Sequence, residues 1–113
     1  MEKIVEQGFL YDFYGELLTE HQKKIYEDVV YNDLSLAEIA EENGISRQGV
    51  HDMVRRCNRT LQAYEDKLHL IERFMRVKMN VTKLQELAQD EELTRGELAE
   101  EVSLLSGRIL EEL

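Results

Sequence analysis

The sequence contains no proline, no tryptophan and only one cysteine in 113 residues. A single cysteine excludes an internal disulfide, and we expect Cys57 to pack on the buried side of a helix rather than to react. Without proline and with only six glycines, the chain has little material for the turns of a sheet protein. Its many Glu, Leu, Lys and Arg residues favour helices, so the sequence predicts an all-α protein.

Long hydrophobic runs are also missing. No segment approaches the roughly 20 consecutive apolar residues that a membrane-spanning helix needs. The N-terminus lacks the basic and then apolar pattern of a signal peptide. We therefore expect a cytoplasmic protein without membrane insertion, and its length fits a single helical domain over residues 1–113.

Groups that could perform chemistry are sparse. The three histidines, His21, His51 and His69, are scattered, and no cysteine or carboxylate at a ligand spacing unites them. The sequence has no glycine-rich phosphate loop and no nucleophile beside a partnered base. We expect no enzyme activity, no metal site and no cofactor.

The stretch from Ser35 to Arg56 has the pattern of a helix-turn-helix. Ser35 and Glu38 are spaced as a capping box, in which each side chain bonds the other residue's amide at the start of a helix. Asn43-Gly44 tolerates the left-handed backbone that ends a helix sharply, and Ser46 then caps the next helix. The apolar residues that two steeply crossing helices could share are Ile39, Ala40, Ile45, Val50, Met53 or Val54, and Cys57.

Two helices are predicted before this stretch. The first spans residues 2–18, and the second begins at a capping box formed by Thr19 and Gln22 and runs to about Tyr31. The first helix carries an aromatic cluster that is surrounded by acidic residues, so we interpret it as core or a self-association patch rather than as a base-stacking surface. The cluster consists of Phe9, Tyr11, Phe13 and Tyr14.

The helical pattern after Ser46 continues to about residue 68, so the helix-turn-helix core with its extended recognition helix spans residues 19–68. Residues 69–113 form either a helical hairpin or a second long helix after a bend near His69, and a further capping box starts at Thr94. Their apolar surface could close within the chain or serve as a dimerisation segment. We favour a homodimer, because dimers bring two recognition helices together. The apolar positions are Leu70, Ile71, Phe74, Met75, Met79, Leu84 and Leu87, then Leu98, Val102, Leu105, Ile109 and Leu113.

Charge is distributed unevenly along a chain whose net charge is −10. Residues 1–45 contain three basic and eleven acidic residues, residues 46–78 contain eight and four, and residues 79–113 contain three and nine. Positive charge is therefore concentrated in the second helix of the helix-turn-helix and its continuation, as nucleic-acid contact requires. The acidic flanks would confine such contact to that surface.

One face of that second helix carries side chains suited to nucleic acid, at spacings of three and four residues. Arginine and glutamine pair with guanine and adenine edges respectively, and further arginines bind phosphates. The alternatives for this face are a solvated polar surface and a protein-docking module. The candidates are Arg47, Gln48 and His51 for base edges, and Arg55, Arg56 and Arg59 for phosphates.

Three runs, Leu18–Gln22, Asp33–Ala40 and Gly44–Val50, together resemble region four of bacterial sigma factors, which reads a promoter element. The segment Ser46–Val50, the aromatic N-terminus and the acidic, leucine-bearing tail also resemble the YlxM family of Gram-positive bacteria over essentially the whole chain. The long C-terminal half has no counterpart in region four. The resemblance places a nucleic-acid contact role on Arg47, Gln48, His51 and Arg55.

The YlxM resemblance implies a DNA-binding helix-turn-helix protein that is encoded beside the signal recognition particle GTPase and acts in that pathway. We therefore expect a regulator that binds double-stranded DNA. The competing hypothesis is a protein-binding adaptor that contacts the signal recognition particle GTPase or its RNA without sequence-specific DNA binding. The net charge of −10 and the surplus apolar surface of the C-terminal half motivate this alternative.

Overall fold

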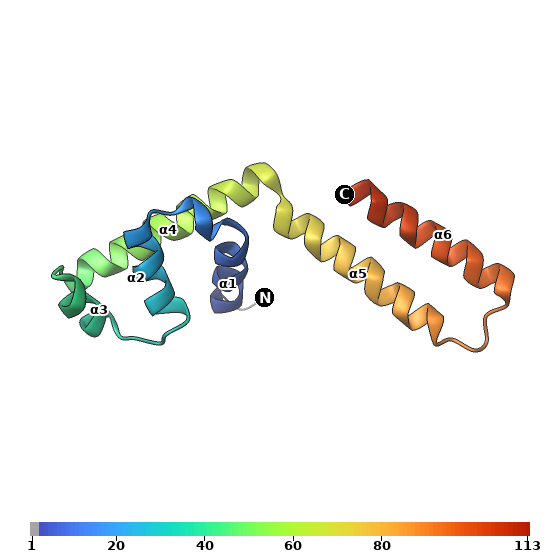
Figure 1. Cartoon of the computed structure of the whole chain (residues 1–113), viewed down its shortest axis with the longest axis horizontal. Coiled ribbons are helices and arrows are strands. Elements are labelled where there is room, and N and C mark those ends of the chain that lie inside the picture. Colours follow the sequence, from blue (N-terminus) through green and yellow to red (C-terminus); the bar gives the residue numbers. More distant parts are fainter. Residues whose placement is uncertain (1–2) are drawn as a thin grey trace. The chain divides into compact units, whose positions relative to one another are not determined.

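The computed structural model describes residues 3–113 and their side chains from Val5 onward. These residues form six α-helices and one short 3-10 turn, without a strand in the described range, which confirms the all-α prediction (Figure 1). The chain divides into two compact units, the first ending at His69 and the second comprising Leu70–Leu113. The first unit contains the helix-turn-helix.

Helix α1 spans Lys3–Tyr14 and continues as a 3-10 turn over Gly15–Leu17. The prediction of one α-helix over residues 2–18 is therefore wrong at its C-terminal end, and residue 2 lies outside the described residues. At the start of this turn, a Cβ atom at Gly15 would lie 2.8 Å from the ring of Tyr11, so the position suits glycine. The tighter turn closes with a 3.0 Å bond from the Leu18 amide to the Gly15 carbonyl.

Helix α2 spans Glu20–Val30 and begins with the predicted capping box. The Gln22 amide donates to Thr19 Oγ1 at 3.2 Å, and the Thr19 amide donates to Gln22 Oε1 at 2.9 Å. The helix ends at Tyr31, whose amide bonds the Glu27 carbonyl at 2.8 Å. Both predicted boundaries of this helix are confirmed.

Helices α3 (Leu36–Asn43) and α4 (Arg47–Leu68) form the helix-turn-helix. The turn is set by Gly44, whose φ of +65° ends α3, and by Ser46, whose Oγ accepts the Gly49 amide at 2.9 Å. At the start of α3 only half of the predicted box forms. Ser35 Oγ accepts the Glu38 amide at 3.1 Å, but the exposed Glu38 side chain does not return a bond to the Ser35 amide.

Helices α2, α3 and α4 share the core that the spacing of apolar residues predicts. Ile25 of α2, Ile39 and Ala40 of α3, and Val50 of α4 are buried together. Helix α1 adds Tyr14, which is 1% exposed. Partly buried side chains complete the core, namely Val29, Leu34, Ile45, Met53 and Val54. This core fixes the orientation of α4 relative to α2 and α3.

The second unit is an antiparallel hairpin of α5 (Leu70–Ala88) and α6 (Arg95–Glu112) (Figure 1). Thr94 begins α6 with the predicted capping box, since its Oγ1 accepts the Glu97 amide at 3.1 Å and the reciprocal bond measures 3.2 Å. The break between α4 and α5, which the sequence did not fix, occurs at His69. Its φ of +55° ends α4, and its amide bonds the Glu65 carbonyl at 2.8 Å.

Candidate nucleic-acid interface

The candidate interface lies on the face of α4 opposite the core. Val50, Cys57 and Leu61 are at most 1% exposed and define the buried face of this helix. Because successive residues advance by about 100° around a helix, Gln48 and Arg59 point almost directly away from these three. A tertiary hydrogen bond helps to hold the helix in place, since the Tyr26 hydroxyl of α2 donates to Oδ1 of the partly buried Asn58 at 2.6 Å.

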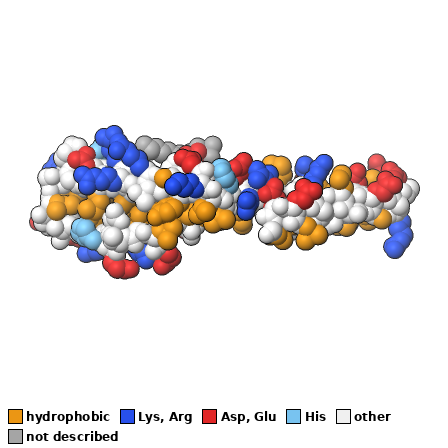
Figure 2. All heavy atoms as spheres, turned by 90° about the horizontal axis from the view of Figure 1, so that it is seen from above, with side chains coloured by type: hydrophobic (Ala, Val, Ile, Leu, Met, Phe, Trp, Pro, Cys, Tyr) orange, Lys and Arg blue, Asp and Glu red, His pale blue; other side chains and the backbone are white. Residues whose placement is uncertain are grey.

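All six predicted contact residues lie on α4 with exposed side chains. They do not form a single narrow stripe, because the helical period spreads them over about half of the circumference. Arg47 lies at one margin of this band and Arg56 at the other, with the rest between them. Figure 2 shows Lys and Arg side chains gathered on one face of the first unit. The complete set is Arg47, Gln48, His51, Arg55, Arg56 and Arg59.

Three of these arginines surround a hollow. Arg55, Arg56 and Arg59 line it together with Asp52, and its volume is about 210 Å³. Three guanidinium groups beside one carboxylate leave an excess of positive charge at a solvent-facing depression. Guanidinium groups present paired donors that match phosphate oxygens, so the hollow suits a phosphate or another anion.

Asp52 is the functional residue that the sequence reasoning missed. Its Oδ1 accepts a hydrogen bond from Gln48 Nε2 at 3.0 Å and lies 3.9 Å from Nδ1 of His51. The carboxylate therefore contacts two of the three side chains assigned to base edges. The signal was present in the sequence, because residues four apart on a helix are neighbours.

The N-terminal end of α4 differs from the other capped helices in its charge. No acidic residue occupies its first turn, whereas the first turns of α2, α3 and α6 each contain a glutamate. The positive end of the helix dipole therefore keeps its attraction for anions here. This N-terminal end of α4 lies beside the side chains of Arg47 and Gln48.

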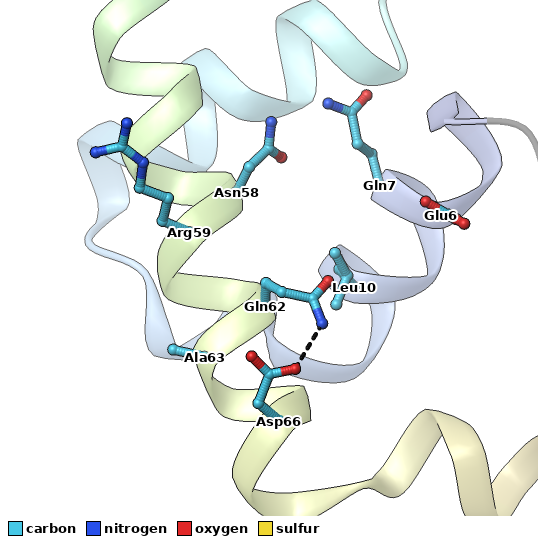
Figure 3. Close-up of a pocket in the computed structure, with 8 residues that line it drawn as sticks. All are labelled: Glu6, Gln7, Leu10, Asn58, Arg59, Gln62, Ala63 and Asp66. Atoms are coloured by element: carbon cyan, nitrogen blue, oxygen red, sulfur yellow. Dashed lines mark hydrogen bonds between the residues drawn. The ribbon is translucent and has the colours of Figure 1, made fainter.

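A groove between α1 and α4 bounds the arginine-rich surface (Figure 3). It has a volume of about 410 Å³, and Arg59 is the one cation among its lining residues. Glu6 of α1 and Asp66 of α4 add carboxylates, and Asp66 Oδ1 accepts a bond from Gln62 Nε2 at 2.9 Å (Figure 3). Carboxylates repel phosphates, so the surface suited to a nucleic-acid backbone ends near Arg59.

The comparison with protein families agrees with this architecture. The model of the UPF0122 family, described as "Putative helix-turn-helix protein, YlxM / p13 like", matches residues 1–102. The chain belongs to the UPF0122 family. The matched range includes the helix-turn-helix and extends into α6, so the hairpin is part of what this chain shares with the family. The predicted YlxM resemblance is thereby confirmed.

UPF0122 proteins of several Bacillus species are similar to this chain. Those of Bacillus thuringiensis strain Al Hakam and Bacillus mycoides strain KBAB4 are each 39% identical over 105 residues, covering 93% of this chain and 96% of the relative. The protein of Bacillus anthracis strain A0248 is 38% identical over the same span. The family description names a helix-turn-helix and indicates no catalytic role.

Other features of this UPF0122 member bear on what kind of site it offers. Within the described residues, no three His, Cys, Asp or Glu side chains gather as metal ligands. No described helix has both the length and the apolar character to cross a bilayer. Cys57 is 1% exposed, and burial raises the pKa of its thiol, so this residue packs in the core as expected.

Proposed function

We propose that this chain is a cytoplasmic DNA-binding regulatory protein that contacts duplex DNA with α4, acts as a homodimer and takes part in the signal recognition particle pathway. The observation that carries the DNA-binding part is the cluster of Arg55, Arg56 and Arg59 around one hollow, on the helix that a helix-turn-helix uses for recognition. The pathway assignment rests on the YlxM resemblance alone. The function is binding, not catalysis.

The six residues divide into two roles along α4. Recognition helices place their N-terminal residues against base edges in the major groove, so Arg47, Gln48 and His51 read sequence. The three arginines that follow bind phosphates and set the register of the helix on the duplex. The acid-free first turn of α4 favours a phosphate near its N-terminus as well.

The acidic remainder of the chain supports a restricted mode of contact. Residues 1–45 contain eight more acidic than basic residues, and residues 79–113 contain six more. These charges repel a duplex outside the arginine-rich face and lower non-specific affinity. Discrimination between sequences then depends on the few side chains near the start of α4.

A protein-binding adaptor is the second candidate. It would contact the signal recognition particle GTPase or its RNA and would retain the helix-turn-helix as scaffold. The observations that favour it are the net charge of −10 and the exposed apolar side chains of the hairpin, such as Met79 at 60% and Leu104 at 50%. A surface of this kind marks a protein contact more often than a nucleic-acid contact.

Fluorescence anisotropy across a salt series separates the two functions. The purified chain is titrated into labelled random duplex DNA and, separately, into signal recognition particle RNA. Replacing Arg55 and Arg59 by alanine should weaken duplex binding about tenfold or more and lower the log-log salt slope by about 2, because two phosphate contacts are lost.

The matched control removes two cations elsewhere. Lys83 and Arg108 lie on the hairpin, and their replacement by alanine changes the net charge equally. This control should retain duplex affinity within about twofold. An equal loss of duplex affinity in both variants would show that the effect comes from net charge alone, and it would contradict a dedicated α4 interface. Binding of the RNA without the duplex would favour the adaptor.

A further inference from the structure

The hairpin buries little of its own apolar surface. Helix α5 contains no fully buried residue, and Leu105 is the one buried side chain of α6. Two packed helices form a single layer, and a stable arrangement needs a second layer to cover the apolar side. Apolar side chains of the hairpin remain exposed, as the orange atoms on α5 and α6 in Figure 2 show.

One face of the hairpin is polar. Arg76 Nε bonds Glu112 Oε1 at 2.6 Å, which joins the two helices along one edge of their contact. Lys83, Glu101 and Arg108 line a hollow of about 320 Å³ further along the same edge. Opposite charges are mixed here, as is typical of a surface that remains in water.

The other face carries exposed apolar side chains, and the helical positions of Lys78 and Arg95 fall beside them. With about 100° per residue, Val81 lies about 140° around α5 from Arg76, and Leu110 lies about 160° around α6 from Glu112. Val102 lies about 80° around α6 from both Leu110 and Glu112, on the same side of the buried Leu105 as Leu110. Val81 and Val102 are each 41% exposed, and Leu110 is 71% exposed. Because the helices are antiparallel, the two stripes face the same side of the hairpin.

Acidic residues are absent from this apolar face, although they are abundant in the hairpin. The same helical arithmetic places both glutamates of α5 and all five of α6 outside the two stripes. Between the apolar residues of α6 lie Ala99, Ser103 and Ser106, which are small enough for another helix to approach closely. A partner surface with the same charge as this chain is therefore not repelled here.

We infer that the face containing Val81, Val102 and Leu110 is the interface with a second copy of this chain, an inference that rests on the homodimer of the proposed function, and that two hairpins form a four-helix bundle. A two-fold axis brings the same patch together from both copies, so an acid-free apolar face is complementary to itself. These three side chains supply the apolar centre of the interface, and the residues around them supply the rest of its area. A standard interface takes about 800 Å² from each partner, a little over half of it apolar.

The mass of the full chain in solution tests this inference without any nucleic acid. Sedimentation equilibrium over a wide concentration range should give twice the chain mass of 13.3 kDa. Replacing both Val102 and Leu110 by glutamate should weaken the dimer by about a hundredfold or more, because like charges are then juxtaposed across the axis. A wild-type chain that stays monomeric at the highest concentration would overturn the inference.

The matched control uses an exposed leucine on the polar side of the same helix. Leu104 is 50% exposed and shares its stripe with Glu101 and Arg108, so Leu104→Glu should leave the dimer intact. Dimerisation that survives in the double variant, or that is lost equally in the control, contradicts this face as the interface. Far-UV circular dichroism verifies the helix content of each variant. If a glutamate variant loses helix, the comparison is repeated with glutamine, which is neutral, at the same positions.

Discussion

The carboxylate of Asp52 accepts a hydrogen bond from the side-chain amide of Gln48 at 3.0 Å, one turn away on the exposed face of α4. Gln48 is the one amide among the predicted base contacts, so its donor group is engaged within the chain when no ligand is present. An adenine edge would have to replace Asp52 as the acceptor. Contact with DNA at this position is therefore an exchange of partners, and its net gain is smaller than that of a new bond.

Removal of this acid should strengthen non-specific binding. Asp52→Ala frees the Gln48 amide and removes the one carboxylate among the residues that line the arginine hollow. We expect affinity for random duplex DNA to rise about threefold to tenfold at low salt and the difference to shrink as salt increases. Anisotropy titrations measure this directly. Glu100→Ala, which changes the net charge equally on the hairpin, serves as control, and an equal gain there would contradict the local role of Asp52.

Two glycine substitutions should change stability in opposite directions. Gly44 has φ of +65°, so alanine at this position should cost about 1–2 kcal/mol, although no atom lies within 4 Å of the added Cβ. Gly107 lies inside α6 with equally open space and an ordinary φ, so alanine there should stabilise its helix by about 1 kcal/mol. Urea unfolding monitored by far-UV circular dichroism compares the two. Destabilisation in both variants would show that packing, not backbone conformation, governs these positions.

Stability should fall at alkaline pH. Burial and the carboxylate of Asp12 raise the pKa of Tyr31 from 10.0 to about 12, and burial likewise raises the pKa values of Tyr11 and Tyr26. The folded state therefore keeps these protons while the unfolded state releases them between about pH 10 and pH 12. The stabilisation is complete below the unfolded-state pKa and is lost as pH rises through this window.

Urea midpoints measured on both sides of that window check the alkaline prediction. Tyr31→Phe should reduce the fall, because phenylalanine has no proton to release in either state. The Tyr31 hydroxyl donates to Asp12 Oδ1 at 3.0 Å, so the variant loses this bond and has a different stability at neutral pH. Only the change of the urea midpoint with pH is therefore compared. An unchanged pH dependence in the variant would argue against the contribution of this side chain.

Local rules predicted much of the fold. Thr19, Ser46 and Thr94 bond the amides that their positions in the sequence require, because capping depends on residues three apart. The change from α-helix to 3-10 turn at Gly15 was not predicted, because the apolar pattern of residues 2–18 continues to Leu17 and Leu18 without a break. The bend near His69 was expected from the sequence, but its exact position was not, because no glycine or proline marks it and the left-handed residue is a histidine.

The candidate site divides similarly. The arginines of α4 were predictable because helical periodicity alone places Arg55 and Arg59 opposite Val50. The groove beside Arg59 was not, because three of its eight lining residues come from α1, and single-sequence periodicity does not show which helices meet. The apolar positions of the hairpin were recognised in the sequence, but their division into a seam and an exposed face required the antiparallel pairing of α5 with α6.

The burial of Cys57 has a consequence for how copies of the chain associate. Because the chain has no other thiol, oxidants cannot link two copies covalently while the fold is intact. The association inferred for the hairpin would then be reversible, and the amount of paired chain would depend on the square of the free monomer concentration. Occupancy of a paired DNA site would respond steeply to the abundance of this protein in the cell and would be insensitive to redox state.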